Sequence, residues 1–569
     1  MTHSSETGNS SPNTSSEILW RRIFYGMAIL TLIIMPLLSF DFGITWDERM
    51  QGHYGKLILR YILTGGHNHD FMDFAETTYL YGGFFDTLTG FIYAVLFESP
   101  HQFAFSGLND TVKGISGQDV HLSGFYETRH VMNALFGFVA MFYTGLLAKL
   151  LKSWRSACLA FLLILLSPRF FGDSMNNPKD IPFAMAYVFS LHSMILFLKE
   201  LPKPKKSTIT LLAVGIATAI GVRIGGLILI FYFFIFTGCQ WLFLKNSKMP
   251  VPHPAPLLGK LFLIAVLGYL GGLLFWPYGQ MNPMLNPLLT FKTFSNFTGA
   301  ASPLLFEAKT YSSASLPWYY IPKWLGISNP LTVLVGVLSA FLLLRPLSQP
   351  LKFYGVLFTA FAFLFPIISV MIKRPILYDG WRHLLFVYPP MVVLAALAWD
   401  KIFEQSKNSS LRLGVLAAFV CLGFQPLVWM IKNHPHESVY FNPLVGGIDG
   451  AQGRYQTDYW GNSLRGCAEW LGNHLKAQNQ DRVYIIHSDG NSMSSFPYLH
   501  KILGQNYLPY KYVPSRIKKL RNPDYGIFIS KPLGRDAFLG NAWPPPGTIY
   551  TVNADNTALC AVVQNTETT

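Results

Sequence analysis

The sequence predicts a polytopic α-helical membrane protein, with about eleven transmembrane helices and a small C-terminal α/β domain on the outer face. Three observations lead to this fold class. Of the 569 residues, 51% are hydrophobic and only 13% are charged, against a charged share of about 25% in soluble domains. Mean hydropathy is +0.31. Long apolar runs recur as far as residue 431, and the remainder is more polar and often interrupted by Pro and Gly.

The apolar runs are long enough to cross a bilayer as helices, which takes about 17–25 residues. We expect eleven such spans, at 22–40, 130–150, 156–172, 182–199, 208–222, 225–244, 259–276, 326–344, 354–372, 384–400 and 413–431. A further run, 79–97, is short and is interrupted by three glycines and Asp86. We interpret it as an interfacial helix within a large outer loop, 41–128.

The distribution of charge sets the expected orientation. The chain has 44 Lys and Arg against 30 Asp and Glu, a net charge of +14. Much of this surplus lies in short loops on one side of the predicted spans, which the positive-inside rule explains if the N-terminus is cytoplasmic and the C-terminus periplasmic or extracellular. No nucleic-acid recognition motif accompanies the charge, so nucleic acid is not an expected partner. The expected location is the inner (cytoplasmic) membrane.

The chain is expected to have three regions. They are a disordered cytoplasmic tail (1–20), the membrane domain (21–431) and an outer domain (432–569). The tail is rich in Ser, Thr and Asn, a composition typical of disorder. In the outer domain the pattern predicts a helix at 463–475 and strands at 483–487 and 526–530.

The five cysteines form no CxxC pair and show no metal-ligand spacing. Cys467 and Cys560 could form a disulfide if the C-terminal region is exported, but two free thiols are our expectation. In the first loop His67, His69 and Asp70 are a candidate metal cluster. Because no matching ligands stand elsewhere, a polar turn is the expected structure there.

Two adjacent acids stand just beyond the first span. They are Asp47 and Glu48, in the run 42–49. Placing carboxylates beside the hydrocarbon core costs free energy, so such residues are usually functional. Asp47 can serve as a general base for a lipid-linked substrate. It could instead cap a helix or bind a cation. His53 and Tyr54 follow as weaker candidates on the acceptor side.

The loop between the third and fourth predicted spans gathers further charges, including Arg169, Asp173, Lys179 and Asp180. The positive-inside rule disfavours cations on the outer face, so cations found there indicate an anionic ligand. Arginine in particular suits phosphate oxygens. Pairing with loop acids or lipid headgroups is the alternative for each cation. Asp180 could also cap the next helix, because a carboxylate favours the positive helix end.

A third polar run lies between the ninth and tenth predicted spans. It contains Tyr378, Trp381, Arg382 and His383. Arg382 and His383 could hold the phosphate of a lipid carrier and stabilise it as it leaves. Trp381 is a weak candidate on the acceptor side, and with Tyr378 it could equally belong to an aromatic belt at the membrane surface.

Together these runs resemble the GT-C glycosyltransferases, which include the protein O-mannosyltransferases and the aminoarabinose transferases that modify lipid A. The resemblance covers residues 20–431 in architecture, with motifs at 45–48, 169–182 and 381–383. The runs 169–182 and 440–461 are more similar to a bacterial branch of dolichyl-phosphate-mannose-protein mannosyltransferase-like proteins. The outer domain differs from the sugar-binding domain of the eukaryotic mannosyltransferases, so the acceptor is left open.

The resemblance implies roles for individual residues. Asp47 matches the catalytic base, Glu48 the acid beside it, and Asp180 a second acid that orients the acceptor or the base. Arg382, with His383 and Arg129, matches groups that hold the lipid phosphate. The full set of candidate phosphate-binding residues is Arg129, Arg169, Lys179, Arg382 and His383.

The function expected from these residues is inverting glycosyl transfer. The sugar would pass from a polyprenyl-phosphate-linked donor to an acceptor protein, lipid or glycan on the outer face, among membrane lipids. A monophosphate leaving group can be held by Arg and Lys alone, so no cofactor is required, and a divalent metal is left open. One alternative is a transporter or flippase for lipid-linked sugars, which predicts charges near the midplane and inverted repeats. The other is a structural subunit of an envelope complex.

Overall fold

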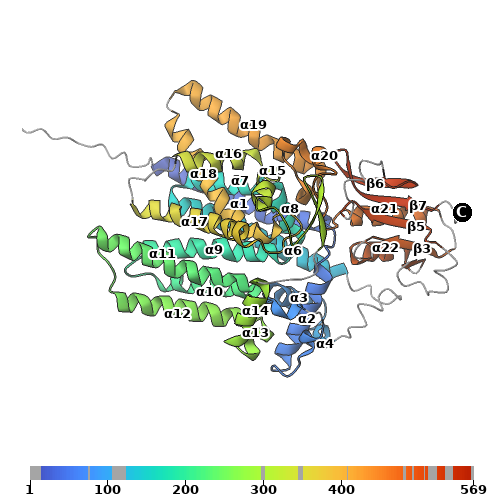
Figure 1. Ribbon diagram of the computed structural model, residues 1–569, viewed down its shortest axis with the longest axis horizontal. Coiled ribbons are helices and arrows are strands. Elements are labelled where there is room, and N and C mark those ends of the chain that lie inside the picture. Colours follow the sequence, from blue (N-terminus) through green and yellow to red (C-terminus); the bar gives the residue numbers. More distant parts are fainter. Residues whose placement is uncertain are drawn as a thin grey trace, which may run out of the picture.

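The computed structural model describes residues 14–74, 77–105, 123–295, 302–343, 350–406, 408–478, 482–489, 492–504, 506–509, 522–531 and 542–565. Figure 1 shows a bundle of long helices and, at one end of it, a small domain that contains a β-sheet. Helices α2 (Glu48–Leu63) and α3 (Phe84–Phe97) of the first loop lie at that same end. The first loop and the C-terminal domain therefore share one face of the molecule.

The bundle helices coincide with the apolar runs of the sequence. In the described part of the chain, eight helices are long and apolar enough to cross a membrane, and nine if a bent pair counts as one span. The helices concerned are α1 (Thr14–Leu38), α6 (Ser123–Leu151), α7 (Trp154–Leu165) with α8 (Pro168–Asn176), α9 (Asp180–Lys199), α11 (Leu227–Asn246), α12 (Pro254–Leu273), α17 (Pro350–Lys373), η7 (Arg382–Val387) with α18 (Tyr388–Gln405), and α19 (Ser409–Asn433). The polytopic helical class is confirmed.

Among the described residues, the number of candidate spans is eight or nine, against eleven predicted. The predicted spans 208–222 and 326–344 overlap α10 (Lys206–Val222) and α16 (Leu331–Leu343), which have 17 and 13 described residues. Both fall short of the roughly 20 residues that a typical transmembrane helix has. Helix α10 ends at Val222 because Arg223 adopts an extended backbone, with φ −148° and ψ 140°.

The predicted span 156–172 is not one straight helix. It is divided into α7 and α8, which are bent by 70° relative to each other. Pro168 is the first residue of α8, and the preceding Ser167 has an extended backbone. Proline has no N–H with which to continue a helix and disfavours helical backbone in the residue before it. The break lets α8 contribute polar side chains to the end of the bundle.

Short elements cover the same end of the bundle. Besides α2 and α3 they are α4 (Pro100–Phe105), α13 (Pro277–Met281), α14 (Leu285–Ser295), the antiparallel strands β1 (Pro303–Phe306) and β2 (Lys309–Ser312), and α15 (Tyr320–Ile327). Helix α3 has 14 residues, about 21 Å, which is too short for a hydrocarbon core of about 30 Å. This agrees with an interfacial helix at 79–97.

The C-terminal domain is a five-stranded mixed sheet with strand order β4-β3-β5-β7-β6. The strands are β3 (Tyr484–Ser488), β4 (Tyr507–Pro509), β5 (Tyr525–Ile529), β6 (Thr548–Ala554) and β7 (Thr557–Gln564). Strand β3 runs parallel to β4 and β5, while β7 runs antiparallel to β5 and β6. Helices α21 (Leu464–Ala477) and α22 (Phe496–Leu503) share its core. The predicted helix and both predicted strands are confirmed.

A disulfide joins the helix and the sheet of this domain. Cys467 on α21 and Cys560 on β7 are bonded, with their Cα atoms 6.5 Å apart. The expectation of two free thiols is therefore wrong. The two cysteines are 93 residues apart in sequence, and they meet because both side chains point into the core between α21 and β7.

The segment 434–463 connects α19 to α21 and packs into the bundle. Its aromatic side chains Tyr440, Phe441 and Tyr455 are buried in the main hydrophobic core. Asn442 donates from Nδ2 to the carbonyl oxygens of Gly326 and Asn329, at 2.8 Å each. The C-terminal domain is thus attached through a buried, hydrogen-bonded segment rather than through a loose tether.

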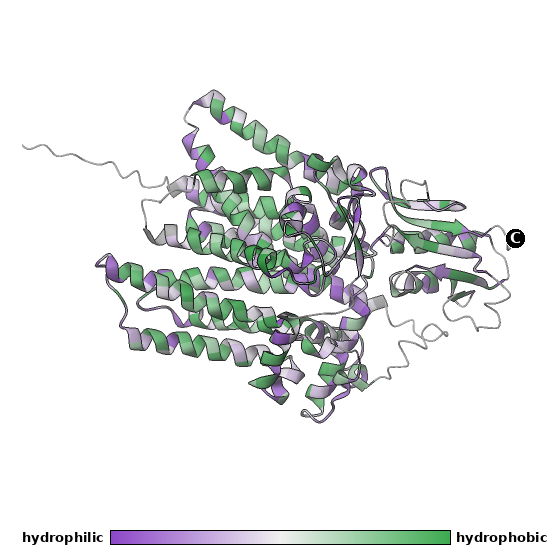
Figure 2. Ribbon diagram, viewed as in Figure 1, coloured by the Kyte–Doolittle hydropathy of each residue, from purple (hydrophilic) through white to green (hydrophobic). Residues whose placement is uncertain are grey.

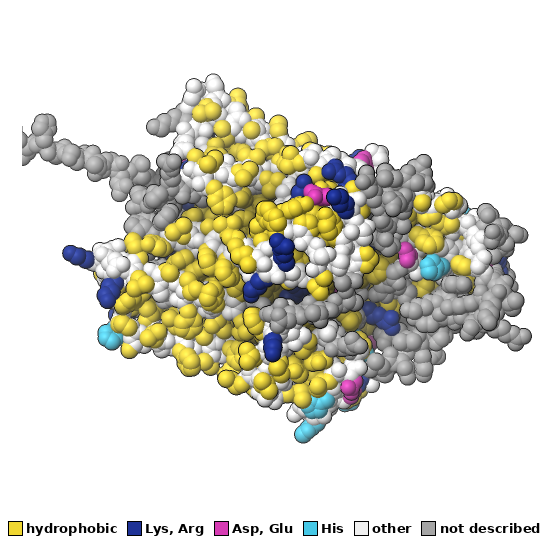
Figure 3. Space-filling model, viewed as in Figure 1, with side chains coloured by type: hydrophobic (Ala, Val, Ile, Leu, Met, Phe, Trp, Pro, Cys, Tyr) yellow, Lys and Arg dark blue, Asp and Glu magenta, His cyan; other side chains and the backbone are white. Residues whose placement is uncertain are grey.

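The surface of the bundle is apolar. Figure 2 shows hydrophobic residues along its long helices, with hydrophilic residues concentrated toward the ends. Figure 3 shows hydrophobic side chains over most of the bundle on that face, with Lys and Arg both at the end away from the C-terminal domain and toward that domain. Large side chains such as Phe262 on α12 and Leu413 on α19 are 68% and 67% exposed. So much exposed apolar surface fits contact with lipid, as in a multi-pass membrane protein.

Candidate active site

Two acids and an arginine, each predicted from a different run of the sequence, meet at the end of the bundle beside the C-terminal domain. Arg382, the first residue of η7, places Nη1 3.5 Å from Asp47 Oδ2 and 3.6 Å from Asp180 Oδ2. Its Nε lies 3.3 Å from Oδ2 of a third acid, Asp379. Asp47 directly precedes α2, and Asp180 is the first residue of α9. One guanidinium therefore links three loops that are far apart in sequence.

Aromatic rings hold this guanidinium in place. Its carbon Cζ lies 4.9 Å from the ring centroid of Tyr378 and 4.7 Å from that of Trp460. Trp460 is itself fixed, because its Nε1 donates to Asp173 Oδ1 at 2.7 Å. Arg382 is buried. A planar guanidinium between π faces and carboxylates has few other orientations available.

Asp47 is the most accessible of the three acids. Its side chain is 29% exposed, whereas those of Asp180 and Asp379 are 1% and 8% exposed. It precedes α2 but makes no side-chain capping hydrogen bond, so the capping alternative is not realised. Oδ2 faces Arg382, and Oδ1 has no partner among the described residues. That oxygen can take a proton from a bound molecule.

Asp180 is engaged on both oxygens. Oδ1 pairs with Arg223, and Oδ2 accepts from Asn177 Nδ2 at 3.0 Å as well as facing Arg382. The side chain of Asn177 also accepts from the Asp180 backbone N–H at 3.0 Å, at the start of α9. Asp180 thus positions two arginines. Because both of its carboxylate oxygens already have partners, it is poorly placed to accept a proton from a substrate.

Lys179 is a cation that forms no ion pair within the described part of the chain. Its Nζ lies 3.8 Å from the ring centroid of Tyr81, and it makes no hydrogen bond or ion pair with the described residues. Burial, together with the nearby Arg223, lowers the pKa of Lys179 to about 8, and the charge of Asp47 partly opposes this shift. His383 is close by, and its ring packs edge-on against that of Tyr378 at 4.6 Å. The ammonium of Lys179 can therefore pair with a bound anion.

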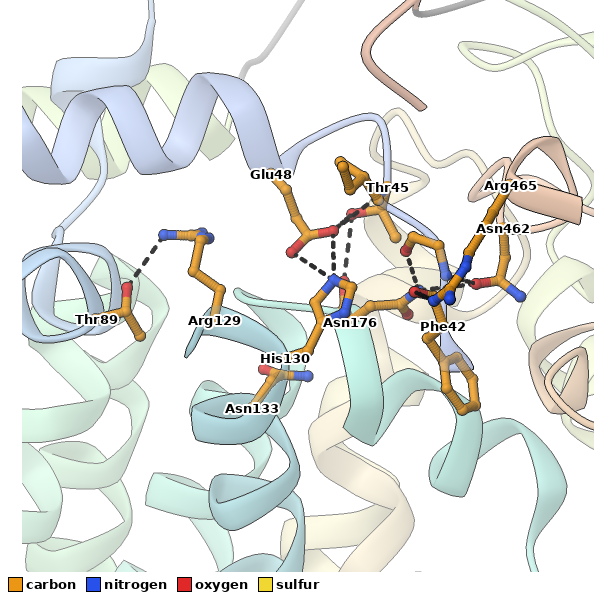
Figure 4. A network of polar contacts seen from close by, with 12 residues as sticks. Phe42, Thr45, Glu48, Thr89, Arg129, His130, Asn133, Asn176, Asn462 and Arg465 are labelled. Atoms are coloured by element: carbon orange, nitrogen blue, oxygen red, sulfur yellow. Dashed lines mark hydrogen bonds and ion pairs between the residues drawn. The ribbon is translucent and has the colours of Figure 1, made fainter. Parts of the chain in front are cut away.

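Glu48 is buried in a network of its own, shown in Figure 4. Its carboxylate accepts from the Thr45 backbone N–H at 2.7 Å and from the Thr45 hydroxyl at 3.1 Å. The other oxygen lies 3.1 Å from His130 Nε2 on α6. The Thr45 hydroxyl also reaches the backbone oxygen of Asn176 on α8, at 3.2 Å. Glu48 therefore holds the turn that carries Asp47 against the bundle.

Replacing Glu48 by Ala is expected to destabilise the protein by about 2–4 kcal/mol, because a buried N–H, hydroxyl and imidazole lose their common partner. Glu48→Gln should cost less, since its amide oxygen can still accept from Thr45. Thermal unfolding of the purified proteins in detergent measures both effects. The exposed Asp73 of the same loop provides the control, Asp73→Ala. An unfolding temperature of Glu48→Ala equal to that of the wild type would contradict this role.

Arg129 and Arg169 lie apart from the three acids and have partners of their own. Arg129 Nη2 pairs with Asp86 Oδ1 on α3 at 2.8 Å. Arg169 donates from Nε to the backbone oxygen of Tyr440 at 2.9 Å, and its Cζ lies 4.8 Å from the ring centroid of Phe441. Both arginines are buried, so the structure gives them packing contacts and does not bring them to Asp47.

The three candidates for the acceptor side are also buried. Tyr54 donates its hydroxyl to the backbone oxygen of Tyr81 at 2.8 Å. Trp381 donates from Nε1 to the Ser328 hydroxyl at 2.9 Å. Burial lowers the pKa of His53 to about 4. These contacts place all three in the packing around the site.

Two residues that the sequence analysis did not single out belong to the cluster. Lys531, two residues beyond β5, lies with Nζ 3.1 Å from Asp379 Oδ1. Asp379 has a left-handed backbone with φ +57°, and Gly380 follows with φ +71°. An Asp-Gly pair indicates a turn, which could have drawn attention to Asp379. No local pattern marks Lys531, because its partner is 152 residues away in sequence.

Among the described residues, no group of three or more His, Cys, Asp or Glu side chains is arranged to hold a metal ion. Of the candidate cluster in the first loop, Asp70 pairs with Arg60 at 2.6 Å. At the acid cluster, the carboxylates of Asp47, Asp180 and Asp379 face the cations Arg382, Arg223 and Lys531.

Comparison with known proteins finds similarity at the level of the fold. No family model matches the chain, and no curated protein matches its sequence significantly. Among solved structures, the oligosaccharyltransferase of Archaeoglobus fulgidus in its apo form is similar at a TM-score of 0.48, with 13% identity over 88% of this chain and 69% of that one. ArnT from Cupriavidus metallidurans in the apo state is similar at 0.47, with 12% identity over 96% and 98%. ArnT bound to undecaprenyl phosphate gives 0.46, with 14% identity over 95% and 98%. The predicted similarity to GT-C membrane glycosyltransferases is confirmed as a structural similarity.

Proposed function

We propose that the protein is a membrane glycosyltransferase that moves a sugar from a polyprenyl-phosphate-linked donor to an acceptor by a single, inverting displacement. One observation carries the proposal. Asp47, an accessible carboxylate whose Oδ1 has no partner among the described residues, lies in a cluster of three acids and four cations. A base and an anion-binding surface side by side are the two groups that such a transfer needs.

The charge balance of the cluster favours a singly charged anionic ligand. Its acids are Asp47, Asp180 and Asp379, and its cations are Arg223, Arg382, Lys531 and Lys179. Three negative charges face four positive ones, which leaves one positive charge unbalanced. A sugar phosphodiester on a lipid carries one negative charge and neutralises it. Lys179 provides the contact, because the other three cations are already paired.

The chemistry assigns one step to each group. Asp47 Oδ1 accepts the proton of the acceptor hydroxyl or amine as that group attacks the anomeric carbon. The bond from the anomeric carbon to the phosphate oxygen breaks at the same time, and the electron pair stays on the lipid phosphate. Lys179 and the guanidinium groups stabilise this developing charge. Attack opposite the leaving group inverts the anomeric configuration.

We further place the site on the outer face of the membrane. The Cys467–Cys560 disulfide lies in the domain packed at the same end of the bundle as the site, and disulfides persist in oxidising compartments. The short loops at the opposite end, after α9 and after α11, carry Lys203, Lys205 and Lys248, which agrees with a cytoplasmic surface there.

The proposal is tested with purified protein in detergent and a series of polyprenyl-phosphate-linked monosaccharides, presented with membrane extracts as the source of acceptor. We expect release of polyprenyl phosphate together with sugar incorporation into the extract. If no member of the series is consumed, while a sealed-vesicle assay shows flux of the intact lipid-linked sugar, the proposal is replaced by the transporter alternative.

Anion binding is expected to depend on pH through Lys179. Its pKa of about 8 means that the ammonium is charged below pH 8 and loses its proton above. A bound phosphate raises this pKa, so the affinity for undecaprenyl phosphate should be constant up to about pH 8 and fall above it. Ionisation of the phosphate, with a second pKa near 6, is complete before this range.

The measurement is the dissociation constant of undecaprenyl phosphate between pH 7 and 10. Lys179→Gln should bind more weakly at pH 7 and show no further fall, whereas Lys179→Arg should stay flat because a guanidinium keeps its proton. Lys309→Gln, on exposed strand β2, is the matched control. A wild-type profile that is flat to pH 10 would rule out Lys179 as the titrating contact.

A further inference from the structure

Lys531 brings the C-terminal domain into contact with three segments of the site. Its Nζ lies 3.1 Å from Asp379 Oδ1 and donates to the backbone oxygen of Tyr459 at 3.2 Å. It also lies 5.3 Å from the ring centroid of Trp46, the residue before Asp47. One ammonium thus contacts the loop of Arg382, the segment before α21, and the turn that carries the proposed base.

Asp379 connects Lys531 to Arg382. Its Oδ1 pairs with the ammonium of Lys531, and its Oδ2 lies 3.3 Å from Arg382 Nε. Arg382 then presents Nη1 to Asp47 and Asp180. The left-handed backbone of Asp379 is uncommon for a residue with a side chain, and two cations on one carboxylate help to hold it. The contacts form a continuous chain from the sheet domain to the base.

The backbone at Lys531 is fixed independently of its side chain. The preceding residue, Ser530, shares a buried 2.9 Å hydrogen bond with the hydroxyl of Thr457, and its N–H donates to the Leu559 backbone oxygen on β7. Changing the side chain at 531 therefore removes the ammonium and leaves the docking of this edge of the domain in place.

We propose that Lys531 is a positioning residue, through which the C-terminal domain sets Arg382 against Asp47 and adjusts the charge available to the donor phosphate; this rests on the proposed glycosyl transfer. Without the ammonium, the whole charge of Asp379 acts on Arg382 and draws its guanidinium away from Asp47. The cluster also loses its one unbalanced positive charge. Donor binding and transfer both weaken, although Lys531 touches neither the base nor the reacting atoms.

The test is a double-mutant cycle on kcat and KM for a polyprenyl-phosphate-linked sugar, combined with the Kd of undecaprenyl phosphate. We expect Lys531→Met to lower kcat/KM by about 10–100-fold, with part of the loss in KM. Lys531→Arg should recover most of it, because the charge is retained. Lys531→Met should have little effect in an Asp379→Asn background, since the carboxylate through which it acts has become neutral. Lys476→Met, an exposed lysine on α21, is the matched control.

Three results would overturn the positioning role. They are wild-type kinetics in Lys531→Met, a Lys531→Arg variant as poor as Lys531→Met, and effects of the 531 and 379 substitutions that add independently. The last two would indicate a role in packing only. A wild-type protein that transfers no sugar and binds no undecaprenyl phosphate would remove the proposed function and this inference together. Normal wild-type transfer with any of the three results removes the inference alone.

Discussion

Asp47→Asn is expected to lower kcat for sugar transfer by about 10²–10⁴-fold and to leave the fold intact. The substitution keeps the shape of the side chain and removes its capacity to take a proton. The Asp47 side chain is 29% exposed, and its carboxylate faces Arg382 at 3.5 Å, so little packing depends on its charge. Donor binding should be unchanged or tighter, because one negative charge beside the phosphate is lost.

The measurement compares kcat, the Kd of undecaprenyl phosphate and the unfolding temperature of wild-type, Asp47→Asn and Asp73→Asn proteins. Asp73 is an exposed acid of the same loop and should tolerate the change in all three quantities. Retained transfer by a folded Asp47→Asn protein would show that another group is the base. Loss of both donor binding and folding would show a structural role.

Arg382→Met is expected to have the largest combined effect on stability and activity. It leaves Asp47, Asp180 and Asp379 without their common cation. Removing one partner of a buried ion pair costs about 3–5 kcal/mol. It also leaves two rings, Tyr378 and Trp460, without the guanidinium between them. Transfer should fall below detection, because the position of Asp47 and the stabilisation of the leaving phosphate both depend on this side chain.

Arg382→Lys separates the effect of the positive charge from the effect of the planar guanidinium shape. Lysine restores one positive charge but cannot face three carboxylates with a planar fork, so we expect most of the stability and little of the activity to return. The exposed Arg454, at the same end of the bundle, supplies the control Arg454→Met. Thermal unfolding and transfer assays on the same preparations give the comparison. Wild-type stability in Arg382→Met would show that the acids are balanced by something other than Arg382.

Much of the fold could be predicted because hydrophobicity along a membrane helix is a local property. Most apolar runs of the sequence form single helices, although 156–172 is divided into α7 and α8. The helix and strands of the outer domain followed from short patterns. Pro168 indicates a helix boundary before α8. It does not predict the bend between α7 and α8, because proline is also common at the first position of straight helices. The disulfide depends on how α21 packs on β7, which no spacing between Cys467 and Cys560 reveals.

The candidate site was predictable in part for a similar reason. Asp47, Asp180 and Arg382 are polar residues at the ends of apolar runs, and the ends of neighbouring spans meet at one membrane surface. From the sequence alone, a cation that is available to a ligand cannot be distinguished from one that pairs with an acid inside the fold. Arg129 pairs with Asp86 inside the fold, whereas Lys179 lies over the ring of Tyr81 and forms no ion pair with a described residue.

A single displacement with Asp47 as base is tested by following the anomeric carbon during transfer. A polyprenyl-phosphate-linked sugar labelled with ¹³C at C1 is incubated with purified protein and acceptor extract, and the product is examined by NMR. With Asp47 as a general base in a single displacement, the label should appear in the product with inverted anomeric configuration, and Asp47→Asn should give none. Retention of configuration, or an equal yield from Asp47→Asn, would contradict the mechanism.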